Sequence, residues 1–240
     1  MHRRGPLSLA PDLVATLETV TTATITTMLL KKGIRHCWIK GAMPFSGETK
    51  KRIVGPAFTL RFVPVREDLA TPASWAHPIS TRAAIEAMPE GVIAVADAMG
   101  VTTAGIFGDI LCMRMVRRGV KALVTDGVVR DKAGVVATNL PVWCQGTAAP
   151  ASVNGLTFVG WQEPIACGGV AVFPDDVIVV DDDGAVLIPK DLVDFIASEG
   201  AEHERYESWV VSEVERGVPL PGLYPPNDEA KARYEAWKKT

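Results

Sequence analysis

The residues best suited to chemistry stand in one stretch, Gly108 to Asp131, whose sequence is GDILCMRMVRRGVKALVTDGVVRD. An acid, Asp109, is followed after twenty residues by Arg130 and Asp131. Two carboxylates without histidine or thiol partners suit a hard cation that prefers oxygen ligands, such as Mg²⁺ or Mn²⁺. An arginine offers a planar fork of donors to a carboxylate or to an enolate oxygen. The stretch therefore predicts a site for a 2-oxo acid.

The residues between the two acids predict elements that bring its ends together. Residues 110–118 mix apolar side chains with arginines, as in a short amphipathic helix that ends at Gly119, and residues 120–124 indicate a buried strand. A ten-residue helix runs about 15 Å, and a five-residue strand returns roughly 16 Å. The chain therefore comes back to the edge it left, where Asp109 and Asp131 can meet.

A second strand completes this unit. The run GVIAVAD, from Gly91 to Asp97, indicates another buried strand, so the whole predicts a strand, a helix and a strand with polar groups at the carboxyl ends of the strands. Open α/β sheets bind their ligands at that edge. Backbone N–H groups at the start of the helix, at Gly108, Ile110 and Leu111, would add an anion site.

Each of these residues taken singly has a purely structural interpretation. Asp109 could cap its own helix, Asp131 could cap a short helix that follows it, and Arg130 could be a surface ion-pair partner. The joint pattern favours a site over three independent structural roles.

This pattern carries a family resemblance. Asp109, twenty intervening residues and Arg130-Asp131, with GDIL before and TDGVVRD after, resemble the family of the 4-hydroxy-4-methyl-2-oxoglutarate aldolases and the regulator of ribonuclease activity A. The segments IVGPAFTLR at 53–61 and GGVAVFPDDVIVVDDDGAVLIP at 168–189 are similar to other recurrent segments of that family. The resemblance extends from Leu17 to Gly217.

The resemblance implies a class II pyruvate aldolase, a lyase that depends on Mg²⁺ or Mn²⁺ and also decarboxylates oxaloacetate. It implies that Asp131 ligates the metal, that Asp109 assists through water and that Arg130 holds the pyruvyl group of a small 2-oxo acid substrate. It also implies a glutamate from a neighbouring subunit, for which Glu207 is the nearest match. Aldolase members often carry an acid three positions after the aspartate, where this chain has Gly134, so metal affinity or substrate preference stays open.

A function of another class is also open. The regulator branch of the family binds and inhibits a ribonuclease without being an enzyme, and fold alone does not separate the two branches. The presence of Asp109, Arg130 and Asp131 together favours the enzyme. Phosphohistidine domains share a similar swapped sandwich, but they need a histidine beside a glycine pair, and Gly168-Gly169 is followed by Val170.

Length and composition bound the fold class. A chain of 240 residues with 48% hydrophobic composition can bury a sizeable core, and mixed helix and strand periodicities predict an α/β protein. The resemblance implies a layered αββα sandwich with a partly closed central sheet, of the swapped phosphohistidine-domain type, assembled into trimers or hexamers with interface sites. A formal net charge of −3 and scattered basic residues argue against a nucleic-acid partner.

Cysteine spacing and hydropathy indicate the compartment. The four cysteines are far apart without a CxxC pair, which argues against structural zinc and a disulfide framework and predicts buried, reduced thiols. No apolar run reaches the roughly 18 residues of a membrane span, and the N-terminal residues lack a signal core. We therefore expect a cytoplasmic protein without a membrane partner.

The two ends of the chain are predicted to be helical. Residues 9–32 indicate one helix that Gly33 ends, and residues 191–216 a long charged helix that breaks at Gly200. We expect residues 1–217 to form the aldolase-like domain. Residues 218–240, a proline-rich connector and a last helix, would form an oligomerisation arm. Trp209, Tyr224, Tyr234 and Trp237 are too much aromatic surface for a free tail, so we expect the tail to dock on its own body or on a neighbouring subunit.

Overall fold

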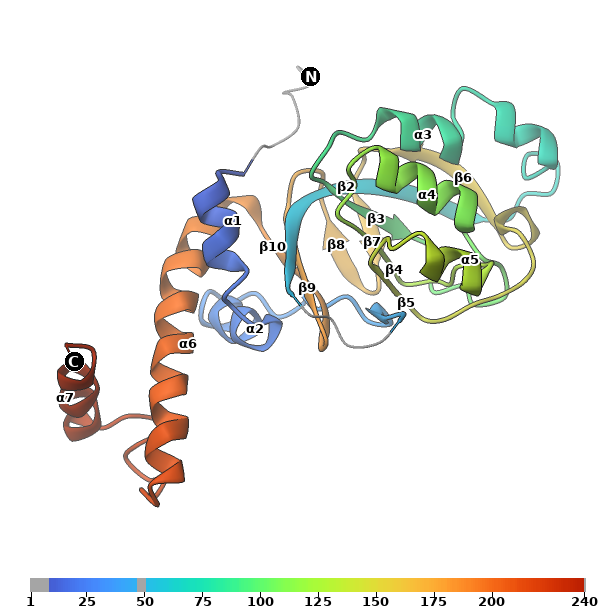
Figure 1. Ribbon diagram of the computed structural model, residues 1–240. Coiled ribbons are helices and arrows are strands. Elements are labelled where there is room, and N and C mark those ends of the chain that lie inside the picture. Colours follow the sequence, from blue (N-terminus) through green and yellow to red (C-terminus); the bar gives the residue numbers. More distant parts are fainter. Residues whose placement is uncertain (1–8, 47–50, 240) are drawn as a thin grey trace.

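The computed structural model describes residues 9–46 and 51–239 (Figure 1). The α-helices are α1 (Pro11–Leu17), α2 (Thr22–Lys31), α3 (Thr81–Ala87), α4 (Asp109–Arg117), α5 (Lys132–Ala137), α6 (Val193–Glu215) and α7 (Asp228–Trp237). The strands are β1 (Met43–Pro44), β2 (Ile53–Pro64), β3 (Ile93–Asp97), β4 (Ala122–Thr125), β5 (Val142–Cys144), β6 (Leu156–Trp161), β7 (Ile165–Cys167), β8 (Val170–Val172), β9 (Val177–Asp181) and β10 (Gly184–Ile188). Short 3₁₀ helices are η1 (Pro72–Ala76), η2 (Ser152–Asn154) and η3 (Lys190–Leu192).

The long strand β2 joins two halves of one mixed sheet. The strand order is β1-β5-β4-β3-β2-β9-β10, and β6 also pairs with β2. Residues 53–56 of β2 pair with β9, and residues 57–61 pair in parallel with β3. A register shift after Arg61 accompanies the pairing with β6. Because β2 serves both halves, the sheet curves round into a nearly closed form.

Strict alternation along the buried strands produces layers. Ile93 and Val95 of β3 share an inner core with Ile178 of β9, whereas Ala94 faces the core beneath α3, α4 and α5. On the opposite side, Val179 faces a third core with α1, α2 and α6. Period-two alternation puts one apolar set on each face of a strand, so two stacked sheet halves lie between two helix layers. The predicted αββα fold class is confirmed.

The N-terminal helix is broken, contrary to the prediction of one helix over residues 9–32. The helices α1 and α2 meet at 98°. Thr21 between them is extended, and its hydroxyl accepts a hydrogen bond from the backbone N–H of Thr24 at 3.0 Å. A threonine in this conformation caps a new helix. The N–H and hydroxyl of Thr21 also donate to Glu204 of α6, at 2.8 and 2.7 Å, which holds the bend.

The second long helix is continuous, and the predicted break at Gly200 is wrong. Helix α6 runs from Val193 to Glu215, and a Cβ added at Gly200 would lie 2.7 Å from Val20 Cγ1. Gly200 is therefore the point where α6 packs closely against the turn between α1 and α2. Tertiary packing offsets the low helix propensity of glycine.

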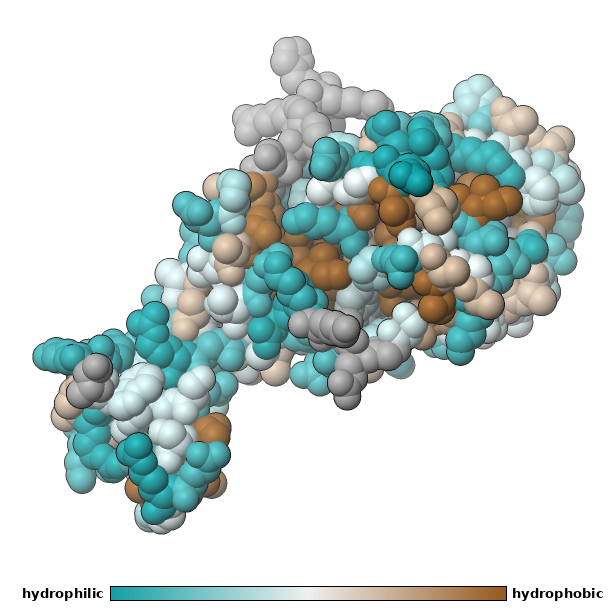
Figure 2. Space-filling model, viewed as in Figure 1, coloured by the Kyte–Doolittle hydropathy of each residue, from teal (hydrophilic) through white to brown (hydrophobic). Residues whose placement is uncertain are grey.

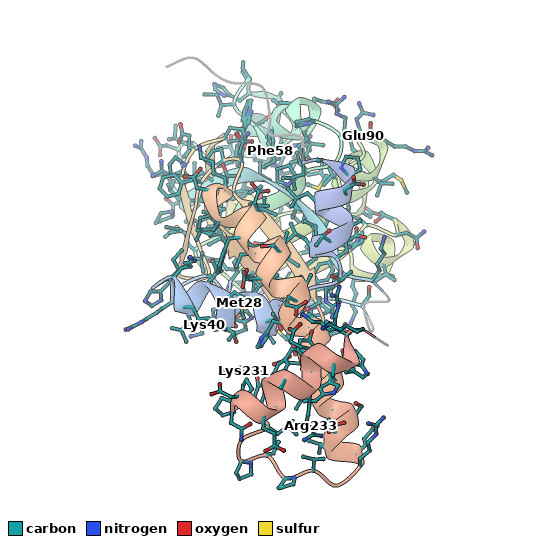
Figure 3. All side chains as sticks on the ribbon, turned by 90° about the vertical axis from the view of Figure 1, so that its left-hand side faces the viewer. Met28, Lys40, Phe58, Glu90, Lys231 and Arg233 are labelled. Atoms are coloured by element: carbon teal, nitrogen blue, oxygen red, sulfur yellow. The ribbon has the colours of Figure 1, made fainter. Side chains whose placement is uncertain are left out.

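The C-terminal half of α6 projects from the layered body, and α7 folds back against it (Figure 1). Trp209 and Tyr234 anchor a separate small core with Leu223. Buried Glu213 pairs with Arg216 at 3.0 Å and also with Arg233 of α7. Lys231 and Arg233 therefore lie on this projecting arm, below the body in Figure 3. The tail therefore docks on the long helix of its own chain, and its role as an oligomerisation arm stays a prediction.

Burial of the cysteines follows the prediction, since Cys37, Cys112, Cys144 and Cys167 are all buried free thiols. Within the described residues, no single helix is both long enough and apolar enough to cross a membrane. The helices α1 and α2, which are bent relative to each other, meet these two criteria only when they are counted as one pair.

Candidate active site

A short parallel pairing brings the predicted site residues together. Gly105 bridges Val128, and the backbone N–H of Ile106 donates to the carbonyl of Val128 at 2.9 Å. One step further along, the N–H of Arg130 donates to the carbonyl of Phe107 at 2.9 Å. The register leaves Gly108 and Asp109 just beyond this pairing on one segment and Asp131 just beyond it on the other.

Arg130 and Asp131 form an ion pair that ligands can reach. Arg130 Nε donates to Asp131 Oδ2 at 3.1 Å, and the two side chains are 37% and 42% exposed. Asp131 has φ 55° and ψ 48°, a left-handed conformation that aspartate tolerates better than most residues. It occupies the N-cap position of α5, yet its side chain makes no capping hydrogen bond. The carboxylate contacts Arg130 instead, so its role is not that of a helix cap.

Asp109 is the first residue of α4, and the N-cap is Gly108. Asp109 Oδ1 accepts a hydrogen bond from the N–H of Ile110 at 2.7 Å, so this N–H, predicted as part of an anion site, is already engaged. Burial raises the pKa of the Cys112 thiol to about 12, and the charges of Asp109 and Asp131 contribute.

Glycines allow the site residues to approach so closely. A Cβ at Gly105 would lie 2.8 Å from the backbone N of Arg130, and a Cβ at Gly108 would overlap Asp131 Oδ2. A Cβ at Gly134 would lie 2.6 Å from Asp109 Oδ2. The starts of α4 and α5 are thus in direct contact through the residues expected to do chemistry.

The donor set suits a hydrated, oxygen-preferring cation. Within residues 9–46 and 51–239, no three or more His, Cys, Asp or Glu side chains are grouped to hold a metal ion. Asp109 and Asp131 supply oxygen donors only, and partial exposure leaves room for water. Mg²⁺ is commonly held by one or two carboxylates and keeps several waters. The residues therefore fit Mg²⁺ or Mn²⁺ better than a softer metal.

Glu207 is not brought to this group within one chain. It belongs to the projecting half of α6, well apart from α4 and α5 (Figure 1). Its carboxylate accepts a hydrogen bond from the Tyr224 hydroxyl at 2.7 Å and pairs with His203 at 3.0 Å. Its assignment to a neighbouring subunit's site remains a prediction.

Sequence reasoning missed the structural role of Asp126. The carboxylate is buried and accepts hydrogen bonds from the N–H groups of Ala98, Gly100 and Gly168 at 2.8, 3.0 and 3.0 Å. Burial raises its pKa, although the three N–H donors oppose that shift. Asp126 ties the loop after β3 to the turn between β7 and β8. The only sequence signal is an acid directly after a buried strand.

A cavity of about 660 Å³ lies elsewhere, between residues 68–81 and 152–159. Its lining includes Trp75, His77 and Phe158 but none of Asp109, Arg130 and Asp131. His77 Nδ1 accepts a hydrogen bond from the N–H of Ile79 at 3.0 Å. His77 is therefore a hydrogen-bonded loop residue that also lines this cavity.

Exposed apolar side chains lie on the two helices that begin at the acidic pair. Ile110 and Met113 of α4 are 79% and 41% exposed, and Val136 of α5 is 41% exposed. Apolar groups also show on the face of the body seen in Figure 2, whereas the projecting arm there is largely hydrophilic to neutral.

Fold and site together define a mixed α/β protein with an acid, arginine and acid at adjoining helix starts. Comparison with known proteins names the class: the chain belongs to the RraA-like family, described as Aldolase/RraA, whose model matches residues 22–187. A solved structure of Streptomyces coelicolor RraAS2, described as an unusual member of the RNase ES inhibitor RraA protein family, superposes with a TM-score of 0.75. It is 33% identical and covers 85% of this chain and 98% of its own.

Two sequence relatives are similar over shorter regions. A Halalkalibacterium halodurans protein named "Putative 4-hydroxy-4-methyl-2-oxoglutarate aldolase" is 38% identical over 140 residues. Protein DlpA of Legionella pneumophila is 31% identical over 159 residues. The matched regions cover 58% and 65% of this chain, but they span 60% and 25% of those relatives' own lengths.

Proposed function

We propose that this chain is a divalent-metal-dependent lyase of the class II pyruvate aldolase type. It would cleave a 4-hydroxy-2-oxo acid such as 4-hydroxy-4-methyl-2-oxoglutarate to pyruvate and would decarboxylate oxaloacetate. The observation that carries the proposal is the accessible Arg130–Asp131 pair beside Asp109 at the adjoining starts of α4 and α5. Membership of the RraA-like family and the name of the H. halodurans relative support it.

Asp131, assisted by Asp109, would hold Mg²⁺ or Mn²⁺. When bound, the cation would supply Lewis-acid polarisation of the substrate's carbonyl oxygen. Asp109 would in addition hold a water that accepts the proton of the substrate's hydroxyl group.

Arg130 would bind the pyruvyl group. Its contact with Asp131 uses Nε, so the terminal nitrogens of the fork are available to a carboxylate or to the C2 oxygen of a 2-oxo acid. During carbon–carbon cleavage the C2 oxygen gains negative charge. A fixed guanidinium then binds the transition state more strongly than the ground state, and this difference accelerates the step. The N–H groups of Gly108 and Leu111 near the start of α4 would add donors for the substrate carboxylate.

The direct test is pyruvate release from oxaloacetate and from 4-hydroxy-4-methyl-2-oxoglutarate. EDTA should abolish turnover, and Mg²⁺ or Mn²⁺ should restore it. Reactions with the cation but without protein correct for the spontaneous decarboxylation of oxaloacetate. The variant Asp131→Asn, which keeps the side chain's size and loses its charge, is the matched control and should not respond to the cation. Full activity after exhaustive chelation would remove the metal from the proposal, and no release with either substrate would remove the lyase.

A second candidate is a regulator that binds and inhibits a ribonuclease. The similarity to RraAS2, whose description places it in a family of RNase ES inhibitors, favours this function. Cleavage of an RNA by an RNase E-type enzyme, measured with increasing amounts of this protein, tests it. The regulator would be favoured if this protein released no pyruvate and bound no divalent cation but still inhibited the ribonuclease. The variant Arg130→Ala should then inhibit as well as the wild type does.

A further inference from the structure

The cavity between residues 68–81 and 152–159 shares no lining residue with the candidate active site. One wall is the segment that contains η1, between β2 and α3, and the other is η2 with the start of β6. Both walls lie at the end of the body that is opposite to the projecting arm (Figure 1). The volume of about 660 Å³ falls within the roughly 300 to 1,000 Å³ of known ligand cavities. This cavity can therefore hold a small molecule.

The walls of the cavity are largely apolar. Leu69, Ile79 and Val159 line it and remain exposed, and the rings of Trp75 and Phe158 belong to the same lining. Covering such side chains removes apolar surface from water, which is favourable. The body of a ligand that fits this cavity should therefore be apolar, and a flat body would suit the two aromatic rings.

Two ring N–H groups of the lining have no hydrogen-bond partner among the residues that the structure describes. They belong to the indole of Trp75 and to Nε2 of His77. The backbone N–H of Ile79 can only donate, so Nδ1 of His77 is the acceptor of their hydrogen bond and the neutral ring carries its proton on Nε2. Both rings therefore offer donors that an acceptor on a ligand would meet.

A cation beside the cavity favours an acceptor that is negatively charged. The guanidinium of Arg82 lies 5.0 Å from the centroid of the Trp75 ring. Glu86, one turn further along α3, would be a natural partner for Arg82, but both of its carboxylate oxygens accept hydrogen bonds from Arg114 at 2.7 Å. Arg82 therefore has no carboxylate partner in the described part of the chain.

The acid in the lining of the cavity is already neutralised. Asp68 accepts two hydrogen bonds from the guanidinium of Arg66, at 3.0 and 2.6 Å. This paired arrangement is the strong form of a contact between an arginine and a carboxylate. Asp68 therefore presents little opposition to a second carboxylate in the same cavity.

We propose that this cavity is a binding site for a small carboxylate with a flat, apolar body. The body would lie against Trp75 and Phe158. The carboxylate would accept hydrogen bonds from Trp75 and His77 and would be attracted by Arg82. The site is additional to the proposed lyase centre and does not depend on it, because the two share no residue.

The test is saturation-transfer-difference NMR with phenylacetate. Acetate, which lacks the ring, and phenylacetamide, which lacks the charge, are the matched control ligands. Phenylacetate should bind with a dissociation constant in about the millimolar range, as is usual for a ligand of its size. Each control ligand should bind about 10-fold more weakly or not at all, because one loses the apolar contact and the other the charged acceptor. No signal from phenylacetate, or equal binding of all three, would overturn the proposal.

Two variants of the lining locate the ligand in the cavity. Trp75→Phe keeps an aromatic ring and loses the N–H, so affinity for phenylacetate should fall about 10-fold. Ile79→Asp adds a negative charge to the wall and should abolish binding, and it should fold because Ile79 is 48% exposed. Leu30→Asp is the matched control, since Leu30 is 57% exposed on α2, outside the lining, and this variant should bind like the wild type. Unchanged affinity in Trp75→Phe or Ile79→Asp, or equal loss in Leu30→Asp, would contradict the assignment.

Arg130→Ala distinguishes the cavity from the candidate active site. This variant removes a guanidinium of the active site and leaves the lining of the cavity intact, so it should bind phenylacetate like the wild type. Loss of binding in Arg130→Ala would place phenylacetate at the active site and overturn the proposal for the cavity. Absence of pyruvate release would overturn the lyase and leave binding in the cavity unaffected, so the two proposals fail separately.

Discussion

Arg130 is the residue whose chemistry and structural environment lead to opposite expectations. As a partly exposed ion-pair partner of Asp131 it should contribute little to stability, because exposed pairs are worth roughly 0 to 1 kcal/mol. As a donor to a developing charge it should matter greatly for turnover. Measurements of stability and of turnover in Arg130 variants therefore distinguish a surface ion-pair partner from a residue that binds the substrate.

We expect Arg130→Ala to lower pyruvate release about 10²- to 10³-fold, the usual loss when one preorganised donor is removed. Arg130→Lys should recover little, because an ammonium keeps the charge and loses the planar fork. Melting temperatures measured beside turnover provide the control. Near-wild-type turnover in both variants would leave Arg130 as a surface residue only.

Asp126 leads to a prediction about pH. Burial raises its pKa in the folded chain above that of the unfolded chain, so between these two values the folded chain holds a proton that the unfolded chain has lost. The contribution of Asp126 to the free energy of unfolding is therefore full below the unfolded-state pKa and declines as pH rises through the folded-state pKa.

In Asp126→Asn the amide nitrogen cannot accept, so at least one of the N–H groups of Ala98, Gly100 and Gly168 loses its partner. We expect a loss of about 1 to 3 kcal/mol at neutral pH. The difference in free energy of unfolding between the wild type and the variant should increase as pH falls from the folded-state pKa of Asp126 to its unfolded-state pKa. Urea unfolding of both proteins at several pH values measures this difference. A difference that stays constant or decreases as pH falls would contradict the raised pKa of Asp126.

At the scale of elements, the close packing of α6 on the α1–α2 turn decides the shape of the outer helix layer. Gly200 and Val20 form this contact, and Thr21 and Glu204 hold the turn on the same side. Glycine has a low helix propensity, but at position 200 its lack of a side chain lets α6 pack closely on Val20.

We expect Gly200→Ala to destabilise the chain by about 1 to 3 kcal/mol, the typical cost of overpacking. Alanine at an uncrowded helix position would instead stabilise it by roughly 0.5 to 1 kcal/mol. Denaturant unfolding shows whether Gly200→Ala lowers or raises the free energy of unfolding. In a Val20→Ala background, where the crowding methyl groups are gone, Gly200→Ala should lose its penalty, and a persisting penalty would point to another cause.

At the scale of the whole molecule, the projecting arm and the helices α4 and α5 carry apolar side chains that a single chain leaves exposed. Val211, Val214 and Leu220 of the arm are 57%, 44% and 54% exposed. Removing such surfaces from water is favourable at roughly 25 cal/mol per Å², so association with further copies is the expected outcome.

We expect sedimentation to show at least three chains per particle, and removal of residues 218–240 to reduce assembly, because this segment is the proposed oligomerisation arm. Glu207→Gln should keep the assembly and lower turnover if a neighbouring subunit contributes this residue. A monomer with full activity would end the case for Glu207 and for a site shared between subunits.

The sequence by itself predicted an α/β protein and the return of Asp131 to the edge where Asp109 lies, and its family resemblance implied the layered arrangement. Alternation in segments such as residues 91–97 and 177–181 assigns each apolar residue to a face, because side chains of a strand alternate with a fixed period. The spacing from Asp109 to Asp131 is equally local, since one helix and one strand return the chain to its starting edge. These patterns depend on neighbours in sequence, which is why they could be predicted.

Only the tertiary structure decided how these parts meet. The register between residues 105–107 and 128–130, the break at Thr21 and the continuity of α6 through Gly200 all depend on partners far away in the chain. Such contacts have no periodic signature, because each is set by the shapes of two surfaces that meet once.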